Sequence, residues 1–432
     1  MKMLKVSVNK RFLVTEDEEP FFWLADTAWE VFNRLNQEET YLYLLNRAKK
    51  GFNVIQAVAL AEFDGLRTGN AYGRKPLLQN EKGEYDPSFL DLEGEYNYWD
   101  HVDYVIDKAE PLGLYIALLP TWGDKYNIKW GKGPVIFDSN NAFTYGEWIG
   151  KRYKHKSNII WVLGGDRPLE QQIHHSIIRA MALGIKKGDE GRHLITFHPM
   201  GGHSSSDYVH DEKWLDFNMI QSGHGYDWDN YSRITSDYNR KPIKPTLDGE
   251  PRYEDHPINF QAKNGYYNDS DVRQSLYWSV FSGGFGVTYG HHSVWSMNKE
   301  PGEYYTLHWR DALDRPAALQ VKHLRALIES RPFLERVPDQ SLLANELAWG
   351  DHIRATRGVS YVFAYTPKGK AIDMNMGRIT GENVKASWFD PRTGEKQYAG
   401  EYENTGLIKF IPPSSGNGSD WVLILDDADI DF

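Results

Sequence analysis

Apolar runs of strand length alternate with segments of helical period along most of the chain, and this alternation restricts the fold more than any other feature. It is typical of repeated βα units around a parallel sheet. The predicted strands cover residues 21–29, 53–62, 114–123, 158–166, 193–200, 217–226, 244–250 and 286–292. The clearest predicted helices cover residues 37–50, 98–110, 172–187, 272–281 and 317–330. Eight such units over roughly 300 residues predict an α/β fold, a (β/α)8 TIM barrel.

The pattern changes near Val337. Short alternating runs follow, such as HIRATR, YVFAYTP, KASWFD and WVLILDD, and turn sequences such as DPRTGE and PPSSGNG separate them. Such spacing predicts a C-terminal antiparallel β-sandwich domain. We therefore expect a barrel with an N-terminal strand pair over residues 1–336 and a sandwich over residues 337–432. The polar, glycine-rich insert 63–97 is expected to form a loop over the mouth of the barrel.

Composition excludes several classes of partner and chemistry. The chain contains no cysteine, so cysteine nucleophiles, Cys-ligated zinc and disulfides are excluded. A net charge of −11 disfavours nucleic acid, because a phosphate backbone would be repelled on average. Residues 1–20 lack the apolar stretch of a secretory signal, and the apolar runs are too short to cross a bilayer. We expect no membrane association and a cytoplasmic location for the chain as given, or a periplasmic or secreted one if a signal was removed.

Polar and aromatic residues gather where the predicted barrel strands end. In a (β/α)8 barrel the active site lies at these carboxyl ends. Asp26 and Glu62 are candidates to accept hydrogen bonds from substrate hydroxyls. His198, His224 and His291 are candidates to bind hydroxyls or to hold a nucleophile. The candidates to stack on a sugar ring are Trp29, Trp122, Tyr226 and Trp295.

Two of the strand-end acids suggest catalysis. Asp166 follows Gly164 and Gly165 at the end of the fourth predicted strand, and Glu250 follows Gly249 at the end of the seventh. These strands lie on opposite sides of a barrel, so the two carboxyl groups can face each other across a substrate. Facing carboxyl groups are the equipment for glycoside hydrolysis, which needs a proton donor and a second carboxylate.

Three alternatives accompany this interpretation. Each acid could instead form a structural ion pair with the arginine that lies nearby in sequence, Arg167 or Arg252. A metal-dependent barrel hydrolase would use imidazole ligands from the set His198, His203, His210, His224, His291 and His292. The first predicted strand lacks the paired histidines of that class, and there is no HExxH motif, so we expect neither a metal nor another cofactor. A non-catalytic carbohydrate-binding protein would need the aromatic rings but not the two acids.

Four blocks of sequence resemble the apiosidase-like glycoside hydrolases. They are FFWLADTAWEVFNRLNQEET, GFNVIQAVAL, NIIWVLGGDRP and LDGEPRYED, and WFDPRTGE resembles the sandwich domain, named for collagen binding, that follows the barrel in this family. The resemblance implies a retaining, exo-acting glycosidase acting on plant cell-wall glycans, with apiose removal from rhamnogalacturonan II as the family activity. It also implies that Asp166 is the acid/base and Glu250 the nucleophile. The wider clan of barrel glycosidases carries Asn-Glu where this chain has Gly165-Asp166, so the acid is one methylene shorter.

Overall fold

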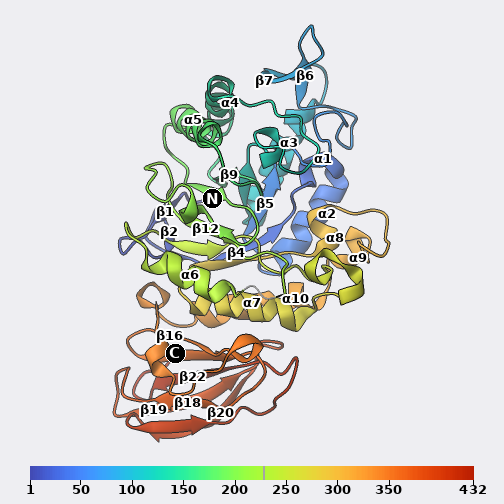
Figure 1. Cartoon of the computed structure of the whole chain (residues 1–432). Helices are drawn as coiled ribbons and strands as arrows, with labels where there is room; N and C mark the ends of the chain where they lie inside the picture. Colours follow the sequence, from blue (N-terminus) through green and yellow to red (C-terminus); the bar gives the residue numbers. More distant parts are fainter. Residues whose placement is uncertain (227–228) are drawn as a thin grey trace.

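The computed structural model of the chain describes residues 1–226 and 229–432. Its larger part is a barrel of parallel strands surrounded by helices, and an antiparallel domain lies below it in the view of Figure 1. The barrel strands are β4 (Trp23–Thr27), β5 (Val54–Val58), β8 (Tyr115–Leu119), β9 (Ile159–Gly164), β10 (Ile195–His198), β12 (Asn218–Gln221), β13 (Thr246–Asp248) and β14 (Gly286–Tyr289). Each lies within one predicted range, which confirms the (β/α)8 barrel.

The strands follow the order β10-β9-β8-β5-β4-β14-β13-β12, and the short β11 (His203–Ser204) is added antiparallel to β12. The barrel closes between β10 and β12 through bonds outside the regular ladder. The amide of Asp216 donates to the carbonyl of Ile195 at 2.9 Å. The hydroxyl of Thr196 donates to the carbonyl of Phe217 at 2.6 Å.

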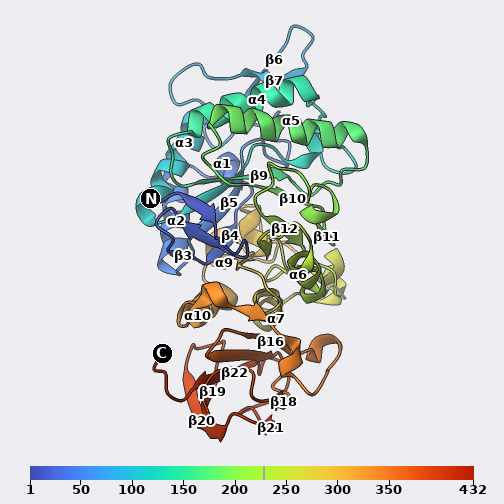
Figure 2. The ribbon, with the colours of Figure 1, turned by 90° about the vertical axis from the view of Figure 1, so that its left-hand side faces the viewer.

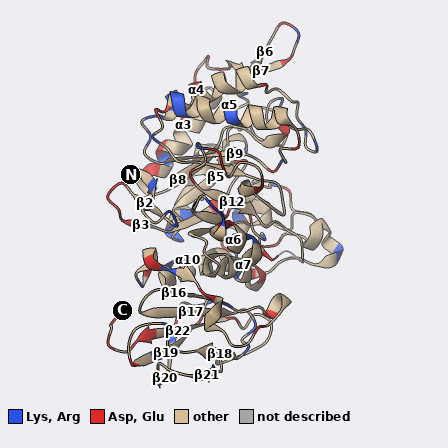
Figure 3. Cartoon of the chain, turned by 60° about the vertical axis from the view of Figure 1, so that its left-hand side comes forward, with Lys and Arg blue, Asp and Glu red and all other residues tan. Residues whose placement is uncertain are grey.

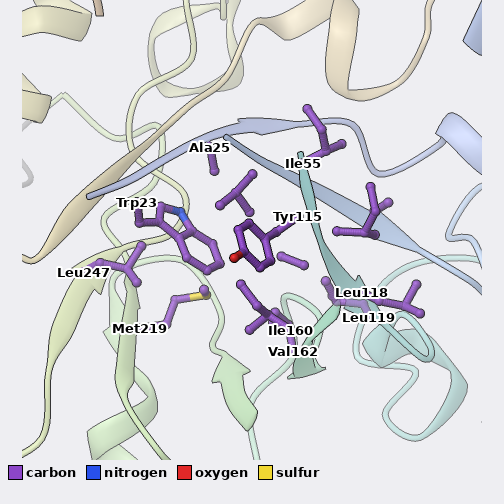
Figure 4. Packing of buried hydrophobic residues seen from close by; sticks show 14 of the residues in the cluster. Trp23, Ala25, Ile55, Tyr115, Leu118, Leu119, Ile160, Val162, Met219 and Leu247 are labelled. Carbon is purple, nitrogen blue, oxygen red and sulfur yellow. The ribbon is translucent and has the colours of Figure 1, made fainter. Parts of the chain in front are cut away.

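The barrel interior is filled with large apolar side chains. Trp23, Ile160, Met219 and Leu247 come from four different strands and meet in the cluster of Figure 4. Every residue of β4, β5, β8 and β9 is buried. Parallel strands covered by helices are buried on both faces, which explains why they occur as continuous apolar runs in the sequence.

The described helices around the barrel are α1 (Val31–Arg34), α2 (Gln37–Lys49), α3 (Tyr98–Ala109), α4 (Ser139–Tyr153), α5 (Gln172–Gly188), α6 (Asn230–Asn239), α7 (Asp269–Phe281), α8 (His292–Trp295), α9 (Trp309–Ala312) and α10 (Pro316–Glu329). Six of them, α2, α3, α4, α7, α8 and α9, begin at a residue whose side chain caps the helix. At α2, the side chain of Asn36 accepts from the amide of Glu39 at 2.9 Å, and Glu39 accepts from the amide of Asn36 at 3.1 Å. The same reciprocal capping starts α3, α4 and α7.

The two segments outside the βα repeat differ from expectation. The N-terminal segment forms three antiparallel strands instead of two, β1 (Leu4–Val6), β2 (Leu13–Thr15) and β3 (Pro20–Phe21). The insert 63–97 contains a hairpin of β6 (Leu77–Gln79) and β7 (Tyr85–Leu90), which lies near α4 on the outside of the barrel (Figures 1 and 2). Leu77 is buried in the barrel core, and the indole of Trp99 donates to the carbonyl of Pro76 at 3.0 Å. These contacts fasten the insert to α3.

The C-terminal domain is a sandwich of a six-stranded and a two-stranded sheet. The larger sheet has the order β15-β16-β17-β22-β19-β20, and β18 pairs with β21 in the smaller one. The strands are β15 (Val337–Pro338), β16 (Arg354–Arg357), β17 (Tyr361–Thr366), β18 (Ile372–Asn375), β19 (Asn383–Phe389), β20 (Lys396–Glu403), β21 (Leu407–Phe410) and β22 (Trp421–Asp427). Ile372 and Phe410 of the small sheet share an apolar cluster with Val362 and Leu423 of the large one.

Helices α7 and α10 lie between the barrel and the sandwich (Figure 2). The rings of Tyr277 and Tyr365 stack across this interface at 4.7 Å. The guanidinium of Arg273 on α7 binds the carboxylate of Asp420 with donor–acceptor distances of 2.8 and 3.0 Å, and both residues are buried. Basic and acidic residues are interspersed along both parts of the ribbon in Figure 3. No helix in the described part of the chain is long and apolar enough to cross a membrane.

Candidate active site

A cavity of about 600 Å³ lies at the carboxyl ends of the barrel strands. Asp166 and Glu250, from the ends of the fourth and seventh barrel strands, both line it. Five more predicted site residues line the same cavity, namely Trp29, Glu62, Trp122, His224 and Trp295. The cavity also contains side chains that the sequence did not indicate: Phe63, Lys129, Trp130, Met200, Gln221, Tyr253, His256, Phe260, Tyr304 and Tyr305.

A sharp backbone turn places Asp166 at the cavity. Gly164, Gly165 and Asp166 have φ angles of 93°, 105° and 56°, so three successive residues adopt left-handed conformations. A Cβ atom at Gly164 would lie 2.3 Å from the carbonyl oxygen of His198, so a side chain there would clash. Asp166 itself is a non-glycine residue in a sparsely populated region, and such strain is concentrated at functional sites.

The carboxyl group of Asp166 is held from one side of the cavity. The indole of Trp130 donates to its Oδ2 atom at 3.2 Å, and Nη1 of Arg167 lies 3.3 Å from the same oxygen. Burial raises the pKa of Asp166 to about 6, and the charge of Glu250 adds to this effect, whereas Arg167 and other neighbours oppose it. Asp166 therefore keeps its proton in mildly acidic solution.

Glu250 has the opposite electrostatic environment. Nε2 of His198 lies 2.9 Å from its Oε2 atom, and Nε2 of His224 lies 3.3 Å from Oε1. Burial favours the neutral acid, but the two imidazoles outweigh it and lower the pKa of Glu250 to about 2. Between about pH 2 and pH 6 the site thus combines a protonated Asp166 with an ionised Glu250, the division of roles that acid-catalysed bond cleavage with a nucleophile requires.

A third carboxyl group, that of Glu62, lies nearby. Nη2 of Arg167 is 3.4 Å from its Oε1 atom, so Arg167 bridges Glu62 and Asp166. Burial raises the pKa of Glu62 to about 7, against the attraction of Arg167 and with the repulsion of Asp166. Near neutral pH, Glu62 can therefore donate as well as accept a hydrogen bond.

Aromatic rings form the walls around these groups. Trp29 and Trp122 lie 5.2 Å apart, and Trp29 meets the ring of His198 edge-on at 5.4 Å. On the other side, Phe63 stacks on Trp295 at 5.3 Å. Such a cavity offers apolar ring faces and a few polar groups, which suits a ligand with both apolar faces and hydroxyl groups.

Comparison with known proteins agrees with this geometry. Residues 7–335 match the family model described as "Apiosidase-like, catalytic domain". The chain belongs to the apiosidase-like family. Residues 337–426 match a second model, described as "Putative collagen-binding domain of a collagenase". No curated protein matches the chain.

Two solved structures that are about one third identical to this apiosidase-like chain are titled as glycoside hydrolases. One, titled "Glycoside hydrolase", is 35% identical over 100% of this chain and 98% of its own, with a TM-score of 0.90. A glycoside hydrolase family 5 structure from Bacteroides vulgatus is 34% identical over 99% of this chain and 93% of its own, also with a TM-score of 0.90. A third structure, from the same organism, is 15% identical with a TM-score of 0.73 and shows the fold alone. The chain is therefore a glycoside hydrolase, and its substrate is a carbohydrate.

The structure places two predicted substrate contacts of the apiosidase-like chain outside the lining of the active-site cavity. Asp26 lies on β4 but faces α2, where its Oδ2 atom accepts from Nε of Arg47 and from the hydroxyl of Tyr43, both at 2.6 Å. His291 caps α8, since its Nδ1 atom accepts from the amide of Ser293 at 2.9 Å while its Nε2 atom lies 3.0 Å from Asp255. Both predicted residues are fully buried and serve the packing of helices against the barrel.

His198 and Tyr226 lie next to the cavity without lining it. His198 is buried behind Glu250, so it can hold that carboxylate but does not form the cavity surface. Tyr226 is 62% exposed and lines a neighbouring cavity between the barrel and the sandwich.

The histidines considered as metal ligands have other partners, and two of them, His198 and His224, lie against the oxygens of Glu250. His203 pairs with Asp207 at 3.3 Å, and His210 contacts Asn218 and the carbonyl of Pro242. Within residues 1–226 and 229–432, no group of three or more His, Asp or Glu side chains is arranged to hold a metal ion.

Proposed function

We propose that the chain is a retaining, exo-acting glycosidase that releases apiose from the side chains of rhamnogalacturonan II in plant pectin. The observation that carries the proposal is the pair Asp166 and Glu250, which line one cavity from opposite strands and have pKa values displaced in opposite directions. The apiosidase-like family membership supports the choice of sugar.

In the first step, a carboxylate oxygen of Glu250 attacks the anomeric carbon as the bond to the leaving oxygen breaks. Asp166 transfers its proton to that oxygen, so the leaving group departs as an alcohol and Glu250 holds the sugar as an ester. In the second step, Asp166 takes a proton from water, and the water oxygen attacks the anomeric carbon. Glu250 is released as a carboxylate, and both groups return to their starting protonation states.

The neighbouring residues have defined tasks in this scheme. Trp130 and Arg167 orient the carboxyl group of Asp166. His198 and His224 keep Glu250 ionised and hold its two oxygens in place.

The test is incubation of the protein with rhamnogalacturonan II and identification of the released monosaccharide by chromatography. Asp166→Asn and Glu250→Gln should each lower kcat by about 10²- to 10⁴-fold. Glu190→Gln is the control, because Glu190 is exposed, forms a surface ion pair with Lys154 and does not line the cavity. Proton NMR of the first product formed should show the anomeric configuration of the substrate. An inverted product would exclude the retaining mechanism, and release of a different sugar would exclude apiose.

A further inference from the structure

A second cavity, of about 750 Å³, lies between the barrel and the sandwich. Its barrel side includes Tyr226, Arg252 and the first turns of α7. Its sandwich side includes Trp349, Lys368 and Asn417. We call this cavity the interdomain cleft.

The interdomain cleft adjoins the candidate active site. His224 and Glu250 line the active-site cavity, and the residues two positions later, Tyr226 and Arg252, line the cleft. Nη2 of Arg252 donates to the carbonyl of Tyr226 at 3.1 Å, and the hydroxyl of Tyr267 donates to the carbonyl of His224 at 3.0 Å. The same two chain segments therefore lie between the two cavities, which are neighbours on the molecule.

Exposed aromatic rings line both cavities. Phe260, at the active-site cavity, is 55% exposed; Tyr226 is 62% and Trp349 is 77% exposed. The side chain of Asn259 accepts from the amide of Tyr226 at 2.9 Å and so holds Tyr226 beside Phe260. Large apolar rings that remain open to solvent along a groove mark a ligand surface, and flat rings suit the apolar faces of sugars.

The loop that carries Trp349 is fixed to the barrel. Gln274 of α7 donates to the carbonyl of Gly350 at 3.0 Å, and the indole of Trp278 donates to the carbonyl of His352 at 2.9 Å. The ring of His352 also stacks on Tyr231 at 4.0 Å. Trp349 itself has a φ angle of 56°, an uncommon conformation for a bulky residue. The loop is thus pre-organised, which lowers the entropy cost of binding.

We propose that the interdomain cleft binds the part of a glycan chain beyond the cleaved bond, with sugar rings stacked on Tyr226 and Trp349. This inference rests on the proposed function for the position of the cleaved bond. It assigns the sandwich domain a part in substrate recognition and makes an extended glycan, not a short glycoside, the preferred substrate.

Binding is tested with the full-length Asp166→Asn protein, so that the ligand is not consumed. Its mobility is measured in native gels containing rhamnogalacturonan II, polygalacturonan, arabinoxylan or galactomannan. We expect at least one of these polymers to retard the protein. Adding Tyr226→Ala or Trp349→Ala should lower the apparent affinity for that polymer about tenfold, or by about 1.4 kcal/mol. Tyr398→Ala is the control, because Tyr398 is 69% exposed on β20 and lines neither cavity. Thermal unfolding of each variant checks the fold.

Catalysis supplies the second measurement. Trp349→Ala should lower kcat/KM on rhamnogalacturonan II about tenfold and leave kcat/KM on 4-nitrophenyl apioside unchanged, and Trp349→Phe should restore part of the loss. Absence of retardation by all four polymers, or equal retardation of the Ala variants and the control, would overturn the inference. Retardation that depends on Trp349 in a polymer that the wild-type protein does not cleave would overturn the proposed substrate and support the cleft.

Discussion

Nε2 of His198 lies 2.9 Å from Oε2 of Glu250, and both side chains are buried. Glu250 lines the active-site cavity, and His198 lies behind it. The contact joins the ends of the fifth and seventh barrel strands. Because burial alone would favour a neutral Glu250, the ionised form depends on its two imidazole neighbours. His198 is therefore a positioning residue for the proposed nucleophile.

His198→Gln should raise the pKa of Glu250 from about 2 toward its ordinary value of 4.5. Glu250 must be ionised to attack, so activity is lost as pH falls through its pKa, and the acidic limb of the kcat/KM profile should move to higher pH. Misplacement of the carboxylate should also lower kcat, by up to about 10²-fold. The control is His203→Gln, which removes a partly exposed histidine paired with Asp207. An unchanged acidic limb in His198→Gln would contradict this role.

The titration of Asp166 is expected to determine the alkaline limb of the kcat/KM profile. The proposed acid must carry its proton, so kcat/KM should fall as pH rises through about 6. Trp130→Phe removes a hydrogen bond that lowers the pKa of Asp166, so this limb should move to higher pH in the variant. Trp148→Phe, on α4 and outside the cavity, should leave the profile unchanged. Movement of the limb to lower pH in Trp130→Phe would show that another group titrates.

Gly164→Ala tests the backbone turn before Asp166. The control Gly191→Ala also places a side chain at positive φ but meets no atom within 4 Å, so it should cost only the conformational strain of about 1–3 kcal/mol. At Gly164 the added Cβ overlaps the carbonyl of His198, so the free energy of unfolding should fall further and kcat should fall with it. Urea denaturation measures the stability of both variants. Equal losses of unfolding free energy in the two variants would mean that the contact between an added Cβ at residue 164 and the carbonyl of His198 does not destabilise the protein.

Asp26→Ala should act on stability and not on substrate binding. The change leaves the buried guanidinium of Arg47 without its carboxylate partner. The free energy of unfolding should therefore fall by about 3–5 kcal/mol. KM of the folded fraction should stay unchanged. Glu62→Gln is the matched comparison, because Glu62 lines the cavity, and it should change KM with little effect on unfolding. A raised KM in Asp26→Ala at full stability would restore the original expectation for Asp26.

The sequence predicted those features that local pattern determines. The strands were predictable because buried parallel strands are continuous apolar runs, and Asp166 and Glu250 stood out because each follows glycine at the end of such a run. The orientation of Asp26 was not predictable in this way, because a strand buried on both faces has no alternation to show which side chain faces the barrel interior. It faces α2, where Arg47 is its partner.

Residues contributed by long loops were missed for a different reason. Trp130 belongs to the irregular segment between β8 and α4, and nothing in its local sequence marks it. Its place beside Asp166 depends on Arg167, whose guanidinium lies 4.3 Å from the Trp130 ring and donates to the Trp130 carbonyl. Such tertiary contacts between distant loops leave no periodic signal.

The buried pair of Arg273 and Asp420 affects how a substrate must enter. With the stacked Tyr277 and Tyr365, it joins barrel and sandwich through buried contacts, so we expect the two domains to move as one body. We then expect a constant distance between the active-site cavity and Trp349, without closure of the two domains around a chain that fits poorly. A glycan that reaches both must adopt the required torsion angles about its own linkages. The protein would thus select its substrate by the conformational preference of the polysaccharide as well as by the identity of the terminal sugar.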